Sequence, residues 1–581
     1  MNGWRHAPQL ASLVLVALVL GCAGPQGQTT SQQAGSGEQA RQNRTLLLAH
    51  RYEPNTLAGK MLQSNGPLRT TRLFNATLSL IDASGAFRPY LAESLPQLNT
   101  DSWRVFPDGR METTYRLRSG LTWQDGTPLT ADDFAFALRV YKDPNLGFFI
   151  NSPQDKIDGV LTPDPQTVVV QWRTSNALGG SLTFGEFDPL PTHVIAGPFG
   201  DYADGRISRD AFLANPLWTT EYVGAGPYRI EAWEQGSSLT GKAFNGHALG
   251  RPKIETVVVR IFIDENTTLA AVLAGGQIDY ACCNTLRFEH YVTLKRDWEA
   301  AGKGRAVSVP STAAFMFLQQ RPEYVGDEAL LDVRVRRALA HAVDRDALND
   351  GLFDGVGSPT DTPVPPSVFF YPELQRIMTH YPLDPNRSAQ LMAEAGFTKN
   401  ASGYFANDQR QFHIDFTVQN SSEIERMQNI LSDSWRKAGF EVRQVVMGTQ
   451  LFTQQETRHT LPGLGYAFFT TGERSLIADE IGTPANRWSG NNRTGWTNPE
   501  YERLWTASLN TLDLNERGSD VARMMAIVSE FLPGYALYFS QAVFTWVAGL
   551  DGPDSDRQAA GFGDSFRETT YYWNIEQWAF K

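Results

Sequence analysis

The stretch "TTYRLRSGLTWQDGTPLTADDFAFAL", residues 113–138, decides the fold class of the region around it. In its first part hydrophobic and polar residues alternate. Tyr115 and Leu117 share one face, and Thr114 and Arg116 share the other. A period of two is typical of a β-strand that is buried on one face only. This part therefore predicts a half-buried strand.

A hairpin turn precedes this strand, and a helix follows it. The Asp108-Gly109 pair in "FPDGR" is a frequent turn sequence between paired strands. Thr130 is followed three residues later by Asp133, which is close to a capping box, where each side chain bonds the other residue's backbone N–H. We expect the helix to begin after Thr130 and to include residues 131–141.

Strands and helices alternate along the whole chain, and no repeat of fixed period is present. The hydrophobic periods and glycine stops predict a mixed α/β protein. The predicted segments include a strand at 253–264 with Val257, Val259, Ile261 and Ile263 on one face, a helix from 265 ended by Gly275-Gly276, a helix from Asp384-Pro385 to Gly396, and a helix and a strand separated by Gly439 within 427–447.

Residues 332–348, "DVRVRRALAHAVDRDAL", predict one helix with Val335, Leu339 and Val343 on its apolar stripe. The opposite face carries basic residues, namely Arg334, Arg337, His341 and Arg345. We expect this face to be solvated or salt-bridged. The alternative is a clamp for a ligand carboxylate.

The N-terminus reads as an export signal. Residues 10–20 are apolar except for Ser12, follow Arg5 and are too short to span a bilayer. Val19-Leu20-Gly21-Cys22 resembles a bacterial lipobox, in which the cysteine is lipidated and becomes the new N-terminus. The next residues are rich in Gln, Gly, Ser and Thr and cannot form a core. We expect a signal peptide at 1–21, a lipid on Cys22 and a tether at 22–44. The alternative is a buried apolar helix that contains a cysteine.

The composition limits the class of protein. The chain has 581 residues, 41% of them hydrophobic, and a formal net charge of −12. About 535 residues remain after the anchor and tether, enough for two to four domains at about 150 residues each. The acidic balance argues against nucleic acid as a partner. Aromatic residues make up 11% and suit recognition surfaces.

Two adjacent cysteines, Cys282 and Cys283, lie in "DYACCN". They are either two small buried residues, or a vicinal disulfide in an exported protein, or reactive thiols. Two cysteines alone do not make a zinc site, and no nearby histidine repeats at ligand spacing. We expect no metal and no cofactor.

Seven segments, in order, resemble motifs of the solute-binding proteins of peptide-type ABC importers, the oligopeptide- and dipeptide-binding family 5. They are "LAESLPQL" at 91–98, the opening stretch at 113–138, "GAGPYRIEAWEQG" at 224–236, "TTLAAVLAGGQIDYA" at 267–281, "DVRVRRALAHAVDRDAL" at 332–348, "PNRSAQLMAEAGF" at 385–397 and "WNIEQWAFK" at 573–581. The resemblance extends from about residue 45 to the end.

The resemblance implies a periplasmic-binding-protein type II fold with two lobes, a hinge and an extra domain. Lobe I would comprise 45–82, 221–319 and 540–581, the extra domain 83–220, and lobe II 320–539. The protein would be a monomeric, membrane-anchored lipoprotein on the exported face. It would capture a small solute, in the first instance a peptide, and deliver it to ABC permease subunits without chemistry of its own. A ligand-sensing lipoprotein without transport and an exported hydrolase are the alternatives.

The ligand-binding residues are expected where this chain departs from the family. Peptide-binding members carry "GWxADYxDP", whose Asp holds the peptide α-amino group, but residues 465–481 read "GYAFFTTGERSLIADEI". Glu473 or Asp479 could replace that carboxylate, and Arg474 could instead face an anion. The family also includes carriers of nickel chelates, haem and sugars, so the ligand class stays open. Further expected contacts are Tyr52, Glu53 and Trp488, with a packed pair of Trp488 and Trp496 as the alternative.

One segment resembles a nucleotide-binding loop. "GSSLTGKA", residues 236–243, is one residue short of a P-loop, and Ala243 stands where Ser or Thr would ligate magnesium. No apolar helix follows it, so we expect a turn between two strands. Neither HExxH nor GxSxG occurs.

Overall fold

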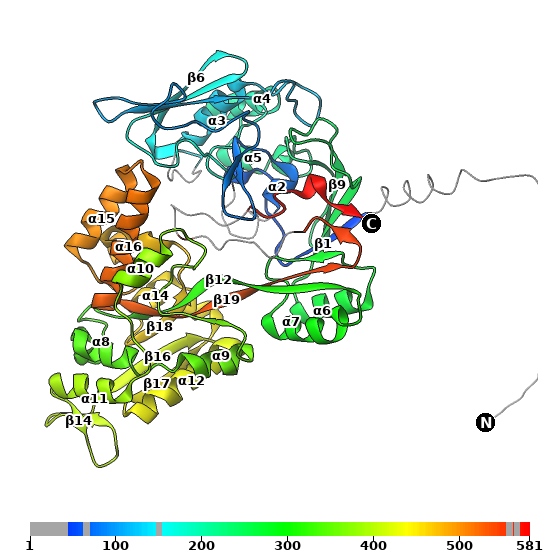
Figure 1. Cartoon of the computed structure of the whole chain (residues 1–581). Coiled ribbons are helices and arrows are strands. Elements are labelled where there is room, and N and C mark those ends of the chain that lie inside the picture. Colours follow the sequence, from blue (N-terminus) through cyan, green and yellow to red (C-terminus); the bar gives the residue numbers. More distant parts are fainter. Residues whose placement is uncertain (1–44, 62–69, 147–153, 554–561, 563–569) are drawn as a thin grey trace, which may run out of the picture. The chain divides into compact units, whose positions relative to one another are not determined.

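The computed structural model describes residues 45–61, 70–146, 154–553, 562 and 570–581 (Figure 1). They belong to one compact unit, Gln42–Lys581. The expected signal peptide, the lipid on Cys22 and the tether lie outside the described residues. None of the described helices is both long and apolar enough to cross a membrane.

One mixed sheet organises the described chain. Its strand order is β17-β16-β18-β12-β19-β11-β1-β10-β9-β8, with β13 beside β19. β1 is parallel to β10 and β11, and β16 is parallel to β17 and β18, whereas β12 and β19 are antiparallel. The strands are β1 Leu46–His50, β8 Tyr228–Glu234, β9 Ser238–Ala243, β10 Thr256–Ile261, β11 Tyr280–Ala281, β12 Gly304–Leu318, β13 Ser358–Pro359, β16 His413–Gln419, β17 Glu441–Met447, β18 Leu464–Phe468 and β19 Gly534–Val547.

The two long strands β12 and β19 connect the two halves of this sheet, as Figure 1 shows. Their register is irregular between Pro310 and Ala313, which divides each strand into two parts. We call the half with β1 and β8–β11 lobe I and the half with β16–β18 lobe II. Lobe I carries α6 Glu265–Ala274 and α7 Phe288–Thr293. Lobe II carries α8 Val333–Ala340, α9 Arg345–Phe353, α10 Tyr371–Ile377, α11 Pro385–Glu394, α12 Ser422–Ala438, α13 Thr449–Phe452, α14 Gln455–Thr460, α15 Pro499–Asn510 and α16 Leu514–Phe531.

Residues 113–138 form the predicted strand, within β5, and the predicted helix, α3. Strand β5 belongs to a separate four-stranded sheet with the order β4-β5-β7-β6. Met111, Thr113 and Tyr115 of β5 are buried, in the predicted alternation. Helix α3 begins after Thr130 with the predicted capping box, whose Asp133 carboxylate accepts from the Thr130 N–H at 3.0 Å. The elements are β4 Trp103–Val105, β5 Met111–Arg116, β6 Ile157–Asp164, β7 Thr167–Trp172, α3 Ala131–Tyr141, α4 Thr192–Ala203 and α5 Arg209–Leu213.

The remaining described α-helix and strands are short. They are α2 Thr71–Phe74, β2 Ser79–Ile81 with β3 Phe87–Pro89, β14 Thr398–Lys399 with β15 Phe405–Ala406, and β20 Leu550–Asp551 with β21 Ala579–Phe580. The C-terminal motif docks through a buried ion pair, in which Arg72 Nη2 lies 2.7 Å from Glu576 Oε2. The same guanidinium donates to the Tyr90 hydroxyl at 2.9 Å.

Successive side chains of β12 point alternately into two hydrophobic cores of lobe II, one on each face of the sheet. Ala314, Met316 and Leu318 enter the core that contains α8, α9 and α12. Phe315 and Phe317 point to the other core, built on α15 and α16. A strand covered on both faces is hydrophobic at consecutive positions, as "AAFMFL" is.

Three other predicted segments are confirmed. Helix α6 ends at Gly275, whose φ of 76° suits glycine. Helix α11 is capped by the Asp384 side chain. Helix α12 ends at Gly439 and leads into β17. The predicted strand at 253–264 is shorter, because β10 ends at Ile261 and Ile263 is 75% exposed.

The prediction of one helix over 332–348 is wrong. The segment forms α8 and then α9, which begins after the N-cap Asp344. The Asp344 carboxylate accepts from the Ala347 N–H at 2.8 Å and caps the start of α9. A second helix therefore begins where the sequence predicted that the first would continue. The Arg334 side chain is salt-bridged to Asp332, as expected.

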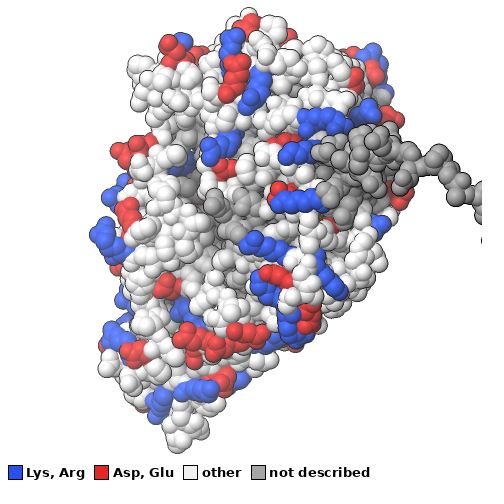
Figure 2. All heavy atoms as spheres, turned by 45° about the vertical axis from the view of Figure 1, so that its right-hand side comes forward, with Lys and Arg blue, Asp and Glu red and all other residues white. Residues whose placement is uncertain are grey.

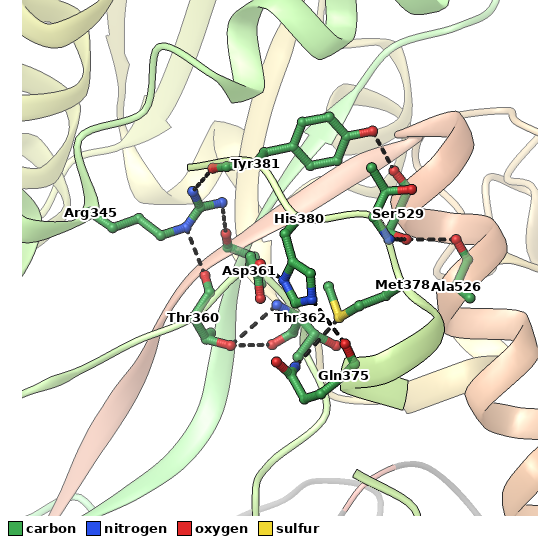
Figure 3. Close-up of polar contacts among 12 residues, drawn as sticks. Arg345, Thr360, Asp361, Thr362, Gln375, Met378, His380, Tyr381, Ala526 and Ser529 are labelled. Carbon is green, nitrogen blue, oxygen red and sulfur yellow. Dashed lines mark hydrogen bonds and ion pairs between the residues drawn. The ribbon is translucent and has the colours of Figure 1, made fainter. Parts of the chain in front are cut away.

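Arg345 was expected on a solvated face, but its side chain bonds to other segments of the protein. Its guanidinium donates to the backbone carbonyls of Thr360 at 2.9 Å and Tyr381 at 3.2 Å (Figure 3). It also donates to the Ala536 carbonyl at 3.1 Å. Arg345 therefore ties α9 to the segment after β13, to the segment before α11 and to β19. It acts neither as a solvated side chain nor as a carboxylate clamp.

The segment that resembles a P-loop is a β-hairpin. Gly236 has a φ of 76° in the turn between β8 and β9, and β9 occupies residues 238–243. Among the described residues that follow this turn, no helix begins before α6, so the turn lacks the helix N-terminus with which a P-loop binds phosphate.

Candidate functional site

The carboxyl ends of the parallel strands β1 and β11 lie together in lobe I. Ligands of open α/β sheets bind at such ends. Tyr52 follows β1 and is 50% exposed, with the Arg51 guanidinium 5.7 Å from its ring centre. Glu53, in contrast, accepts from Trp233 Nε1 at 2.7 Å and from the Gly236 N–H at 2.9 Å. The Glu53 carboxylate thus supports the β8–β9 hairpin.

A series of ion pairs extends from lobe I to lobe II. Glu265 on α6 bonds to Arg51 and lies 3.0 Å from Arg287, the N-cap residue of α7. Arg287 in turn lies 4.0 Å from Glu423 at the start of α12 in lobe II. Burial raises the pKa of Glu423, and Arg287 opposes that shift. The pair is therefore a polar contact between the lobes.

The Glu473 side chain is buried in lobe II. It lies on a 3₁₀ turn, Gly472–Leu476, after β18, and its exposed fraction is 0%. The hydroxyl of Tyr501 on α15 donates to the Glu473 carbonyl at 2.5 Å. Burial and the nearby Glu473 carboxyl raise the pKa of Tyr501. In this arrangement Glu473 faces the interior and not a ligand.

Arg474 and Asp479 differ in their availability. Arg474 Nε lies 2.6 Å from Glu480 Oε1, and Glu480 Oε2 accepts from the backbone and side chain of Asn491 at 2.9 Å. Arg474 therefore braces its own loop, whereas Asp479 is exposed. Of the two carboxylates expected for an amine, Asp479 is the one that solvent reaches.

The two tryptophans of "RWSGNNRTGW" each pack on a tyrosine. Trp488 is half-buried, with its ring 6.3 Å from that of Tyr324. Trp496 is buried against Tyr501 at 5.4 Å. Trp488 thus keeps an accessible surface, and Trp496 belongs to the core.

The adjacent cysteines form a vicinal disulfide and are both buried. The sequence left this pairing open among three alternatives. It also gave no sign of a neighbouring histidine, but the structure places His50 beside the pair, 233 residues from Cys283. The sequence carries no local signal of this proximity, because it depends on the pairing of β1 with β11.

Charged side chains of both signs are interspersed among uncharged ones on the face drawn in Figure 2. The described part of that face offers no continuous basic surface of the kind that nucleic acid requires.

The sheet order, the paired crossing strands and the separate four-stranded sheet define a type II periplasmic-binding-protein fold, with two lobes joined by a hinge and an extra domain. Residues 89–469 match the model for bacterial extracellular solute-binding proteins, family 5. The chain belongs to this family.

Similar proteins cover almost the whole chain. Oligopeptide-binding protein AppA of Bacillus subtilis is 21% identical over 93% of this chain and 94% of its own length. The oligopeptide-binding protein of Thermus thermophilus, solved with a pentapeptide, has a TM-score of 0.71 at 21% identity and covers 93% of this chain and 97% of its own. NikZ of Campylobacter jejuni, solved with Ni(L-His), has a TM-score of 0.70 at 19% identity, with coverages of 92% and 99%.

Proposed function

We propose that this protein is the substrate-binding lipoprotein of an ABC importer. It captures oligopeptides, or a similar small solute, between its lobes and delivers them to a membrane permease. The observation that carries the proposal is family membership together with the near-complete coverage by oligopeptide-binding relatives. The proposed domain boundaries are those of the sequence analysis, and the protein itself performs no chemistry.

The hinge strands suggest how capture works. A ligand that contacts both lobes binds the closed state more tightly and shifts the equilibrium toward it. The Arg287–Glu423 pair adds a contact between the lobes. A peptide backbone can pair with the strand ends like an added strand, while its side chains occupy wet pockets that tolerate varied sequences.

We propose Tyr52, Trp488 and Asp479 as the first ligand contacts to test, because each has accessible surface. Glu53, Glu473 and Arg474 remain candidates, but each would need to leave its present internal contacts. Tyr52→Ala is expected to weaken peptide affinity at least severalfold in a fluorescence titration. Leu161→Ala on β6, whose side chain is equally exposed at 49%, is the matched control and is expected to change nothing.

Lipidation at Cys22 anchors the protein to the exported face of a membrane in this proposal. Cys22→Ser is expected to leave the protein soluble or unprocessed, as measured by its partition after a carbonate wash. A variant that stays with the membrane would contradict the lipobox assignment.

The alternatives make different predictions. A sensing lipoprotein would bind the same ligand but would lack a transporter operon beside its gene. A hydrolase would release shortened products from bound peptides, which mass spectrometry of the incubated mixture would detect. We expect intact peptides only.

A further inference from the structure

A buried cluster of histidine, cysteine and tyrosine side chains lies at the carboxyl ends of β1 and β11. The parallel register pairs Leu48 with Tyr280 and Ala49 with Ala281. His50 ends β1, and Cys282 and Cys283 follow β11 directly. The strand pairing thus brings residues from distant parts of the sequence to one place.

Tyr572, close to the C-terminus, completes the cluster. Its ring stacks on His50 with centroids 5.8 Å apart and planes at 9°. Its hydroxyl lies 2.5 Å from His50 Nε2 and 3.1 Å from Cys282 Sγ. All four residues are at most 4% exposed.

The three metal-ligating side chains converge. The ligand atoms of His50, Cys282 and Cys283 lie within 4.8 Å of one another, and Cys283 Sγ is 3.9 Å from His50 Nε2. A tetrahedral zinc ion with bonds of about 2.3 Å to sulfur and about 2.05 Å to nitrogen would place these two atoms about 3.6 Å apart. The observed separation therefore needs only a small adjustment.

In the disulfide form the two sulfurs cannot act as thiolate ligands. A dithiol reductant changes this by thiol–disulfide exchange. It supplies two electrons and two protons, the Cys282–Cys283 bond breaks to give two thiols, and the reductant closes into its own disulfide. A divalent cation then displaces both thiol protons.

We propose that the reduced cluster is a binding site for a thiophilic divalent cation such as Zn²⁺, with Cys282 Sγ, Cys283 Sγ and His50 Nε2 as ligands, and that the disulfide abolishes it. Two thiolates neutralise the charge of the cation, so the buried complex carries no net charge. This neutrality makes a site with so little exposure energetically acceptable. His50 lies near Tyr52 in the sequence, but the three ligands are buried, whereas Tyr52 is exposed, and the proposal holds for any class of solute.

Tyr572 has a positioning role in this site. When Nε2 binds the cation, the Tyr572 hydroxyl can no longer bond to it and donates instead to the Cys282 thiolate, 3.1 Å away in the present structure. Such outer hydrogen bonds orient ligands and typically change metal affinity by about 10- to 100-fold.

The test uses the full-length chain carrying Cys22→Ser, so that only two cysteines remain. The protein is reduced with dithiothreitol, freed of it anaerobically, and titrated with Cd²⁺ alone. Uptake is followed by the ultraviolet thiolate-to-cadmium band and by native mass spectrometry. We expect one Cd²⁺ per reduced chain, with a mass increase of one cadmium less two protons, and no uptake by the oxidised chain.

Variants separate a site from incidental thiol binding. Cys283→Ser is expected to lose the band, His50→Gln to weaken binding at least tenfold, and Tyr572→Phe to weaken it about tenfold with a shifted band. His193→Gln, whose ring faces Asp125 at 2.6 Å, is the control that keeps full uptake. Thermal unfolding of each metal-free variant verifies that it folds. Any one of three results would overturn the proposal. They are no uptake by the reduced chain, equal uptake by the oxidised chain, and uptake that neither Cys283→Ser nor His50→Gln changes.

Discussion

Arg345, which the sequence pattern predicts on a solvated face, provides the most direct test of the packing in lobe II. Arg345→Met keeps most of the aliphatic stem and removes the three donors that reach the carbonyls of Thr360, Tyr381 and Ala536. A buried acceptor left without a partner costs about 1–3 kcal/mol. Some relaxation and water entry will recover part of this, so we expect a loss of about 3 kcal/mol or more in the free energy of unfolding.

The assay is urea unfolding followed by circular dichroism, with two companion variants. Arg345→Lys keeps the charge, but a single ammonium cannot reproduce the three-way fork, and we expect a loss between those of Met and wild type. Arg296→Met removes an exposed arginine paired with Asp297 and should change the free energy of unfolding far less than Arg345→Met. If Arg345→Met proved no more destabilising than Arg296→Met, the bracing role of Arg345 would be refuted.

Three further predictions concern single side chains. His380 donates through both ring nitrogens, to the Gln375 carbonyl and to the Asp361 carboxylate (Figure 3), and these two bonds raise its pKa. Its stabilising effect should be complete below pH about 6.5 and disappear as pH rises through the folded-state pKa, so that unfolding curves of wild type and His380→Gln converge at alkaline pH. Burial raises the pKa of Asp188 to about 7, so its contribution to stability should be complete below pH 3.8 and lost as pH rises through about 7; Asp188→Asn should remove this decline, and a decline of unchanged size would contradict the assignment. Asp133→Ala removes the α3 cap and the acceptor of Trp123 Nε1, and should lower the unfolding free energy by about 2 kcal/mol, whereas Asp132→Ala on the same turn should cost less.

Local patterns predicted much of the fold. The alternation around Tyr115, the capping box at Thr130 and the glycine stops at Gly275 and Gly439 depend on neighbours in the sequence, and the structure confirms each. The resemblance of the ordered motifs supplied the two-lobe architecture, which local periodicity alone could not.

The wrong predictions concern features that depend on contacts between residues far apart in the sequence. The periodicity of residues 332–348 suits one helix, yet the Asp344 cap starts a second, and the carbonyls that hold Arg345 come from three separate segments. The ligand-site candidates show the same limit. The sequence marks Glu473 as a charged loop residue, but the Tyr501 helix that covers it is nearly 30 residues away. His50 and Cys283 meet only through the pairing of β1 with β11.

The most direct test of the central claim is native mass spectrometry of the full-length Cys22→Ser chain after incubation with a protein digest that contains peptides of many lengths. The account predicts one-to-one complexes with a series of short peptides, which are released intact on denaturation. A folded protein that forms no peptide complex under these conditions, or that retains a single non-peptide mass, would contradict peptide capture.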